Sequence, residues 1–283
     1  MADASNVDRE TVKGFGREWS TFTQCALADS ERKELFDRYF CLIDWSQKPR
    51  RCLDMGCGSG RWAVLAAPLV DELVAADASR EALEVARRNV RAHNVSFVEC
   101  RPENLPFPDG HFDLIFSLGV LHHLPDTAGA IRSLARKLRP GGTLLLYLYY
   151  AFDTRPAWFR ALWKVSDRAR RLITRAPFPV RYALSQVIAV LVYWPLARAA
   201  KYLPLPDSWP LQFYAERSFY TMRTDALDRF ETMLEKRFTR PQVTAMMDSA
   251  GLTDIRFSDA APYWVHRHPA YFGSSLREAE LMQ

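Results

Sequence analysis

The chain has 283 residues, of which 48% are hydrophobic and 25% charged, and its formal net charge is +5. This composition is typical of a folded globular protein and excludes disordered and collagen-like chains. The five cysteines are odd in number and form no C-x-x-C pair, so neither a disulfide framework nor a zinc site is indicated. A reducing cytoplasm is the expected location.

Two segments bear on targeting. The first ten residues are polar and carry acids before any base, which argues against a secretory signal. The longest apolar run, residues 187–197, has 11 residues and contains Pro195. At 1.5 Å per residue it would extend only about 16 Å, roughly half of a bilayer core. We therefore expect no transmembrane helix there.

From residue 50, short apolar runs alternate with helical segments, as in a parallel sheet covered on both faces. Strands are expected at residues 52–56, 72–77, 95–100, 112–118 and 143–150. Helices are expected between them at residues 61–68, 79–93 and 126–138. Ser79 is the predicted N-cap of the second helix, and RPGG (139–142) is expected to close the third.

The alternation stops after residue 150. Residues 154–220 show helical spacing, and the alternation resumes with a helix at 239–250 and strands at 253–259 and 263–268. The sequence thus predicts three parts. They are a helical N-terminal arm (1–49), a sheet domain (50–150 and 221–283) and a helical insertion (151–220) between the fifth and sixth strands.

The stretch LDMGCGSG (53–60) is a glycine-rich turn after a strand. Its glycines, Gly56, Gly58 and Gly60, are spaced G-x-G-x-G, and Arg61 stands where a dinucleotide fingerprint needs its third glycine. No G-K-[ST] follows. Asp77 ends the second strand 23 residues beyond Asp54, where a carboxylate can accept hydrogen bonds from ribose hydroxyls. The pattern predicts a nucleoside ligand without a pyrophosphate.

Four motifs in order, LDMGCGSG, VAAD, LPFPDGHFDLIFSLGVLHHLPD and LRPGGTLLL, resemble those of class I S-adenosylmethionine-dependent methyltransferases. The resemblance covers about residues 50–150 and the tail from 239. It implies an α/β fold with a Rossmann-like seven-stranded sheet, an antiparallel last strand and helices on both faces. It also implies S-adenosylmethionine as cofactor, with S-adenosylhomocysteine as product.

The resemblance also assigns cofactor contacts to residues at the carboxyl ends of the strands. Asp54 and Gly56 would lie near the methionine portion, Cys57, Gly58 and Gly60 would line the turn, and Asp77 would hold the ribose. Ser117 and Leu118 would flank the methionine amine, with Ala78 and Ser79 near the adenine edge.

The adenine contacts depart from the family pattern. Many relatives have an Asp-Ala pair before the LPF segment, where this chain has Arg101 and Pro102. Arginine cannot accept a hydrogen bond and proline has no N–H to donate. Either Glu103 contacts the adenine or the base is held by stacking.

The segment GFGREWSTF (14–22) carries Phe15, Trp19 and Phe22. Two interpretations stand side by side. These aromatics fold over the bound cofactor as a lid, with Phe15 and Trp19 as contacts, or they pack on the outside of the sheet.

Candidate catalytic residues follow the fourth strand. His123, with His122 beside it, is either a general base for acceptor deprotonation or a structural residue bonded to a loop. His266 and His268 lack a further ligand at suitable spacing, so we expect no metal. Asp225, Asp228 and Glu231, with Arg223 and Arg237, either line an acceptor pocket or form a solvated face; the solvated face is the favoured interpretation.

Charge is concentrated in the insertion. Residues 155–201 hold ten Lys and Arg against the single acid Asp167, a net charge of +9, whereas the rest of the chain carries 28 bases and 32 acids. One helical stripe there is apolar and has bases on its flanks: Trp158, Leu162, Val165, Ala169 and Leu172. The favoured interpretation is a lid packed on the sheet with its arginines in water. Membrane-surface contact comes next, and nucleic acid is not expected as a partner.

These patterns predict a cytoplasmic methyltransferase that acts on a small or medium-sized, hydrophobic or aromatic acceptor, at oxygen rather than nitrogen or carbon. The alternative is methylation of a lipid or quinone-like acceptor at the membrane surface, with residues 155–201 in peripheral contact. A second alternative is a non-catalytic cofactor-binding protein that engages a partner.

Overall fold

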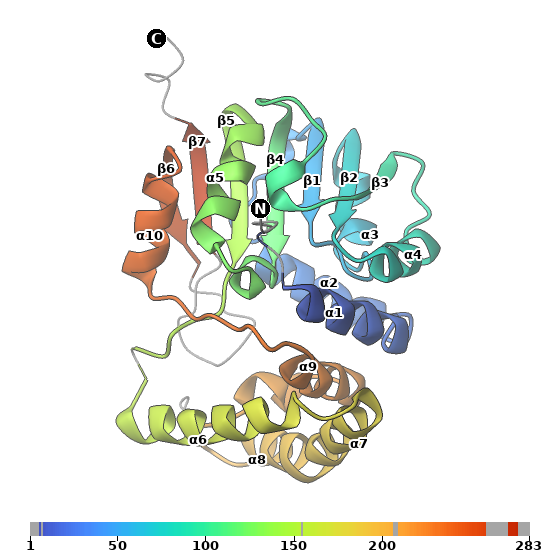
Figure 1. The fold of residues 1–283 in the computed structure, drawn as a ribbon, viewed down its shortest axis with the longest axis vertical. Coiled ribbons are helices and arrows are strands. Elements are labelled where there is room, and N and C mark those ends of the chain that lie inside the picture. The colour runs from blue at the N-terminus through green and yellow to red at the C-terminus, as the bar shows by residue number, and fades with distance from the viewer. Residues whose placement is uncertain (1–5, 7, 154, 206–208, 259–270, 277–283) are drawn as a thin grey trace, which may run out of the picture.

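The structure is a computed structural model that describes residues 6, 8–153, 155–205, 209–258 and 271–276. A seven-stranded sheet forms its centre, in the order β3-β2-β1-β4-β5-β7-β6 (Figure 1). The strands are β1 Arg51–Met55, β2 Glu72–Asp77, β3 Val95–Glu99, β4 Phe112–Leu118, β5 Leu138–Tyr147, β6 Leu252–Phe257 and β7 Tyr271–Leu276. Strands β1 to β5 pair in parallel, and β7 is antiparallel to both β5 and β6. The predicted fold class is confirmed.

Helices cover both faces of the sheet because alternate strand residues point to opposite sides. Leu114 and Phe116 pack into one apolar cluster with α2, α3 and α4, and Leu53 and Ile115 into another with α5 and α10. The helices concerned are α2 Asp29–Tyr39, α3 Ala63–Ala66, α4 Arg80–Asn89, α5 Thr127–Lys137 and α10 Arg240–Asp248. Strand β4 is buried over most of its length on both faces, as its unbroken apolar run predicts.

Three boundaries differ from expectation. The helix expected over 61–68 is only the short α3, followed by a 3-10 turn at Ala67–Leu69. The segment RPGG does not close α5 but lies inside β5, where Gly141 has a φ of +75° and the pairing with β4 shifts its register. A glycine at positive φ lets a strand absorb such an irregularity. The strand predicted at 263–268 lies outside the described residues, and the last described strand is β7.

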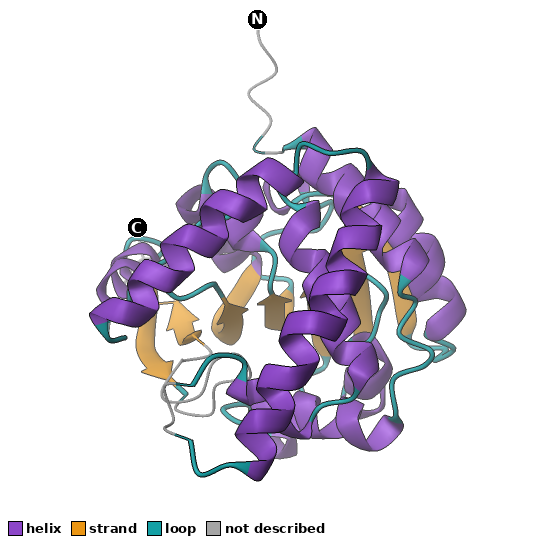
Figure 2. Cartoon of the chain, turned by 90° about the horizontal axis from the view of Figure 1, so that it is seen from below, coloured by secondary structure: helices purple, strands orange, loops and turns teal. Residues whose placement is uncertain are grey.

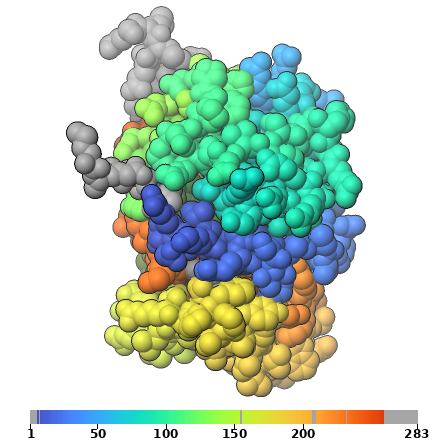
Figure 3. All heavy atoms as spheres, turned by 45° about the vertical axis from the view of Figure 1, so that its right-hand side comes forward, coloured from blue at the N-terminus to red at the C-terminus, as the bar shows by residue number. Residues whose placement is uncertain are grey.

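The N-terminal arm contains α1 Arg9–Thr21 and the helix α2. Helix α1 packs against α4 of the sheet domain and α9 of the insertion. Figure 3 shows this arm, in blue, between the sheet domain and the helices below it. The arm therefore lies beside the carboxyl ends of the strands, where it can line a binding site.

The insertion forms a helical layer beneath the carboxyl ends of the strands, which we call the cap (Figure 1). Its helices are α6 Ala157–Ile173, α7 Phe178–Ile188, a π-helical turn Ala189–Tyr193, α8 Trp194–Tyr202 and α9 Phe219–Glu231. The predicted boundary at 220/221 falls inside α9, which packs along α7 and α1 and is here grouped with the cap.

Helix α7, the π-turn and α8 run on as one helix, Phe178–Tyr202. Its 25 residues are long and apolar enough to cross a membrane, by length and composition alone, and only 22% of its most apolar window is buried. This helix is more than twice as long as the apolar run 187–197. The expectation that no helix crosses a membrane here stays a prediction.

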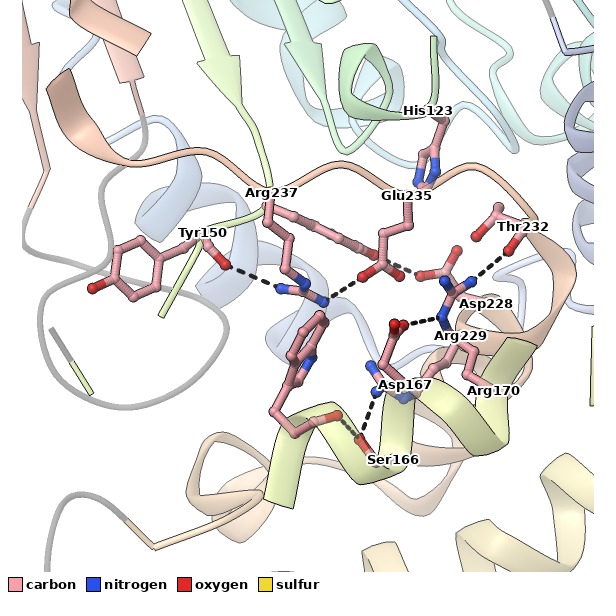
Figure 4. Close-up of polar contacts among 12 residues, drawn as sticks. His123, Tyr150, Ser166, Asp167, Arg170, Asp228, Arg229, Thr232, Glu235 and Arg237 are labelled. Atoms are coloured by element: carbon pink, nitrogen blue, oxygen red, sulfur yellow. Dashed lines mark hydrogen bonds and ion pairs between the residues drawn. The ribbon is translucent and has the colours of Figure 1, made fainter. Parts of the chain in front are cut away.

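Helix α6 also differs from expectation. The predicted lid would turn its apolar stripe to the protein, but Trp158, Leu162, Val165 and Leu172 are exposed. The buried side carries Phe159, Asp167 and Arg170 instead. Phe159 packs on Phe152, whereas Arg170 donates to the Thr232 carbonyl and lies near the charge of Glu235 (Figure 4).

Candidate functional site

The glycine turn between β1 and α3 is tightly enclosed. Gly56 has a φ of +83° and Gly58 a φ of +53°, which L side chains rarely adopt. A Cβ on Gly56 would lie 2.3 Å from a methyl of Val120, and one on Gly58 would lie 2.8 Å from the indole nitrogen of Trp19. Gly60 lets α4 approach, because its Cβ would lie 2.7 Å from Val90. All three glycines are required by close contact as well as by dihedral angle.

Asp77 is held at the end of β2 by the same turn. Its carboxylate accepts hydrogen bonds from the backbone N–H of Gly58 at 2.9 Å and of Ser79 at 2.8 Å. Burial raises the pKa of Asp77, while these N–H donors act to lower it. Two carboxylate oxygens offer about four lone-pair directions, so acceptor capacity remains for ligand hydroxyls.

A first pocket of about 730 Å³ opens beside Asp77. Seven of the predicted site residues line it: Phe15, Trp19, Gly56, Asp77, Ala78, Leu118 and His123. Arg101 and Pro102 line it too, at the place where the sequence predicts a departure from the usual adenine contacts. Phe15 and Trp19 therefore face this pocket, and Phe22 packs on Tyr182 and Tyr220 of the cap.

Other predicted contacts lie elsewhere around the turn. Ser117 is fully buried and donates to the Met55 carbonyl at 2.8 Å, which ties β4 to β1. Glu103 accepts from the Asn6 side chain at 2.6 Å. Cys57 is buried within the turn, and burial raises the pKa of its thiol. None of these three is part of the lining of the first pocket.

Asp54 lies under the turn, 1% exposed, and does not line the first pocket. One of its carboxylate oxygens has no hydrogen-bond partner among the residues that the structure describes. Burial, and then the nearby charge of Asp77, raise the pKa of Asp54 well above its ordinary range. The sequence predicts Asp54 as a site residue, but only the structure shows that its side chain is buried under the turn.

A second pocket of about 500 Å³ adjoins the first. The two share Phe15, Trp19, Leu118 and Gly119 in their linings. Charged and aromatic side chains complete the second pocket: Glu18, Tyr39, Arg61, Trp62, Tyr147, Tyr149, Asp225 and Asp228. Two acids assigned to a solvated face, Asp225 and Asp228, thus line a pocket in the structure.

The side chain of Asp228 is held by a tyrosine that follows β5. The Tyr149 hydroxyl donates to it at 2.9 Å, and Asp225 accepts from the Tyr214 hydroxyl at 2.8 Å. Burial raises the pKa of Asp228, and the neighbouring His123 opposes this rise. A carboxylate with a raised pKa is a stronger base than one in water.

His123 is a neutral imidazole between the pockets and the cap. Its Nδ1 lies 2.7 Å from the Leu234 carbonyl, and its ring meets Phe15 edge-on at 5.1 Å. Burial lowers the pKa of His123, so Nδ1 donates to the carbonyl and Nε2 is the acceptor.

His122 stacks on the Tyr149 ring at 3.8 Å and lines neither pocket. Neither of its ring nitrogens has a hydrogen-bond partner in the described parts of the chain. Burial lowers the pKa of His122 well below its ordinary value. This histidine is placed as a packing residue next to Tyr149.

Buried polar contacts of α6 and of the segment after α9 lie close together, and a hydrogen bond from Arg170 joins the two (Figure 4). Arg170 pairs with Asp167 at 2.8 Å and donates to the Thr232 carbonyl at 2.7 Å. Arg237 pairs with Glu235 at 2.6 Å. Burial raises the pKa of Glu235, but Arg237 and nearby arginines bring it below its ordinary value. These contacts hold α6 and the residues around Asp228 together.

Known proteins share this domain. A family model described as a methyltransferase domain matches residues 53–146. The chain is 41% identical over 102 residues to 27-O-demethylrifamycin SV methyltransferase of Amycolatopsis mediterranei, which covers 34% of this chain and 37% of that protein. It is 36% identical over 116 residues to the ubiquinone/menaquinone biosynthesis C-methyltransferase of Shewanella baltica, covering 38% and 46%. Residues 53–146 therefore carry a domain similar to that of known methyltransferases.

The similarity to solved structures supports the fold. An S-adenosylmethionine-dependent methyltransferase from Thermotoga maritima superposes with a TM-score of 0.50 at 15% identity, over 94% of this chain and all of that one. The curated relatives are matched over less than half of their own length. The family model lies within the sheet domain, and the cap and arm fall outside its residues.

The residues present fit S-adenosylmethionine, the cofactor that the resemblance implies. The first pocket places a carboxylate, Asp77, at the carboxyl end of β2, beside glycines whose Cβ positions are closed to side chains. Among the residues that the structure describes, no three His, Cys, Asp or Glu gather as a metal site would require. His266 and His268 lie outside those residues.

Several pocket residues that sequence reasoning missed come from α1 and its N-cap. Asp8, Thr11 and Val12 line the first pocket, and Glu18 the second. No motif marks them in the sequence. Helical spacing could have found two of them. Thr11 and Val12 precede Phe15 by four and three residues, so they lie on the same side of α1 as Phe15 and Trp19.

Proposed function

We propose that this protein transfers a methyl group from S-adenosylmethionine, bound in the first pocket, to a small or medium-sized organic acceptor bound in the second. The observation that carries the proposal is the wall that both pockets share, formed by Phe15, Trp19, Leu118 and Gly119. Molecules in adjoining enclosed pockets are held in contact and away from water, which is what methyl transfer requires.

The chain's own residues would hold the cofactor as follows. Asp77 accepts from the ribose hydroxyls, the turn at Gly56 and Gly58 admits close backbone approach, and Phe15 and Trp19 cover the pocket. Arg101 and Pro102 face the adenine end, where stacking replaces the usual hydrogen bonds. When bound, S-adenosylmethionine supplies an electrophilic methyl group, and S-adenosylhomocysteine is the product.

The second pocket favours an aromatic acceptor that donates a hydrogen bond. Tyr39, Trp62 and Tyr147 offer ring surfaces, whereas Glu18, Asp225 and Asp228 disfavour an anionic acceptor. We therefore propose methylation at a phenol or hydroxyl oxygen. Asp228 is the proposed base because it lines this pocket and burial raises its pKa. His123, which lines the first pocket, is proposed to position Phe15 and the loop at Leu234.

A second candidate acceptor is a lipid or quinone-like molecule at a membrane. The observation that favours it is the exposed apolar side of the cap. One relative is named as a C-methyltransferase of ubiquinone and menaquinone biosynthesis, although the match covers 46% of it. In either case we propose a cytoplasmic enzyme without a nucleic-acid partner.

Calorimetric titration with S-adenosylmethionine tests the cofactor site. We expect binding by the natural chain and a loss of about tenfold or more in Asp77→Ala, since two charge-assisted hydrogen bonds to the ribose are removed. No binding at millimolar cofactor would overturn the proposal.

Transfer of a labelled methyl group to a panel of phenols, alcohols, amines and quinone precursors tests the acceptor. Asp228→Asn should leave cofactor binding unchanged and lower turnover by about 10²- to 10⁴-fold. Cofactor binding without turnover on any acceptor would favour the non-catalytic alternative, in which the protein engages a partner.

A further inference from the structure

Exposed apolar side chains gather on one part of this molecule. Among the described residues, fifteen large hydrophobic side chains are exposed, and thirteen of them lie between residues 158 and 203. Figure 2, seen from below, shows the helices of the cap in front of the strands. A monomeric soluble protein seldom exposes so much apolar surface in one place.

These side chains form regular stripes. On the helix Phe178–Tyr202 the exposed stripe is Val180, Leu184, Val187, Leu191 and Trp194. The buried stripe of the same helix is Arg181, Ser185, Ala189, Tyr193 and Ala197. Spacings of three and four residues place each set on one side of a helix. The apolar side therefore faces away from α9, on which this helix packs.

Helix α6 repeats the arrangement. Its stripe of Trp158, Leu162, Val165 and Leu172 is exposed, with Leu172 at 67%, whereas Asp167 and Arg170 are buried. We call the two exposed stripes together the apolar face of the cap. Both of these helices of the cap thus turn an apolar stripe outward, where it can meet an apolar partner.

Positive charge surrounds this face. Arg160, Lys164, Arg168 and Arg175 are exposed on α6 or just after it. The one acid between residues 155 and 201, Asp167, lies inside and pairs with Arg170 and Arg171. An apolar face with a basic border is complementary to lipid tails under anionic headgroups.

The aromatic residues and the packing indicate how the face would meet a bilayer. Trp158, Trp194 and Tyr202 are at least half exposed, and such rings favour the headgroup boundary. The helix Phe178–Tyr202, about 37 Å long, is packed along one side on the protein. That side could not face lipid, so the helix would lie in the plane of the interface rather than cross it.

We propose that the apolar face of the cap docks on the surface of an anionic lipid bilayer, with α6 and the helix Phe178–Tyr202 lying in the interface. The proposal goes beyond methyl transfer and does not depend on it, because it concerns the outer side of the cap. The second pocket lies on the inner side, next to α9.

Flotation with vesicles tests this docking on the full chain without cofactor. We expect the protein to float with vesicles of 70% phosphatidylcholine and 30% phosphatidylglycerol, and less with phosphatidylcholine alone. Raising the salt to 0.5 M should weaken the binding, since the basic border is screened.

Variants distinguish the contribution of the apolar face from that of its basic border. Leu172→Glu with Leu191→Glu should lower vesicle binding at least tenfold. Lys164→Gln with Arg168→Gln should lower binding to anionic vesicles and reduce its salt dependence. The matched control is Arg88→Gln with Arg91→Gln, which lowers the net charge by the same two units near α4 and should bind as the natural chain does.

The inference is overturned if the natural chain stays unbound with anionic vesicles, or if Leu172→Glu with Leu191→Glu floats equally well. It is also overturned if the natural chain dimerises through this face and ignores vesicles, which sedimentation velocity would show. Calorimetry with S-adenosylmethionine on the same proteins reports the first pocket separately, so a failure of either proposal is seen independently.

Discussion

The sheet domain and the cap differ in which side chains they bury. In the sheet domain, Leu53, Phe116 and Leu145 are fully buried, and the charged residues of α4 face outward. In the cap, Arg170, Arg181 and Asp167 are buried, whereas Leu172 and Leu191 are exposed. Both regions have amphipathic helices. The comparison teaches that helical periodicity shows that a helix has two sides, and not which side meets the protein.

The two regions also differ in the interactions that stabilise them. The sheet domain is stabilised by apolar burial, which needs no precise partner. The inner side of the cap relies on polar contacts with the segment after α9, in which Arg237 lies over the rings of Tyr149, Phe152 and Trp163 at 4.6 to 5.0 Å. Buried charges stabilise only when every partner is in place, so this side should be sensitive to single changes of charge.

The largest loss is expected in the sheet domain. Phe116→Ala removes a fully buried ring from β4 and leaves a cavity, at a cost of about 3–5 kcal/mol. Urea denaturation measures the change in the free energy of unfolding. A cost below about 1 kcal/mol would contradict the view that this sheet is held by apolar burial.

Breaking the buried pair in the segment after α9, next to the cap, should cost nearly as much. Arg237→Met leaves the Glu235 carboxylate buried without its partner at 2.6 Å, and we expect a loss of about 3 kcal/mol. Arg256→Met is the matched control, because its pair with Asp254 is exposed and should contribute less than about 1 kcal/mol. Adding Glu235→Gln to Arg237→Met should restore part of the stability, and an equal or larger loss would refute the explanation.

A smaller effect is expected at the junction of the two regions. His122→Phe keeps the ring stacked on Tyr149 and removes two nitrogens that have no hydrogen-bond partner in the described chain, a gain of about 1 kcal/mol.

The pH dependence of His122→Phe gives a second readout. Burial lowers the pKa of His122, so the unfolded state binds the proton first and the natural chain loses stability as pH falls below about 6.5. The variant should lose less stability than the natural chain between pH 6.5 and 5 in denaturant titrations. Parallel pH profiles would show that His122 is solvated.

The smallest effect is expected on the apolar face of the cap. Leu191 is 68% exposed, so Leu191→Gln should change the free energy of unfolding by at most about 0.5 kcal/mol while weakening vesicle binding. A cost of 2 kcal/mol or more in denaturation without lipid would mean that another part of the protein or a second copy covers the face.

Much of the sheet domain could be predicted from local patterns. Strands β2 and β4 begin and end where the apolar runs do, and Ser79 caps α4 by accepting from Ala82. The short α3 and the position of RPGG within β5 could not be predicted, because strand pairing with β4 decides them. The family motifs likewise place Gly56, Asp77 and Leu118 at the first pocket, since these residues end adjacent parallel strands.

The second pocket could not be predicted in the same way. Asp225 and Asp228 lie more than a hundred residues after Leu118, on a helix whose spacing fits a solvated face equally well. They line a pocket because α9 packs against α1 and below the end of β5. The sequence alone determined the parallel sheet, the glycine turn and the acid at Asp77, because those depend on short-range periodicity and backbone geometry. Only tertiary packing decided in which direction each cap helix turns its apolar side, because an amphipathic helix is compatible with either orientation until its neighbours are in place. The second pocket and the proposed bilayer contact follow from that direction.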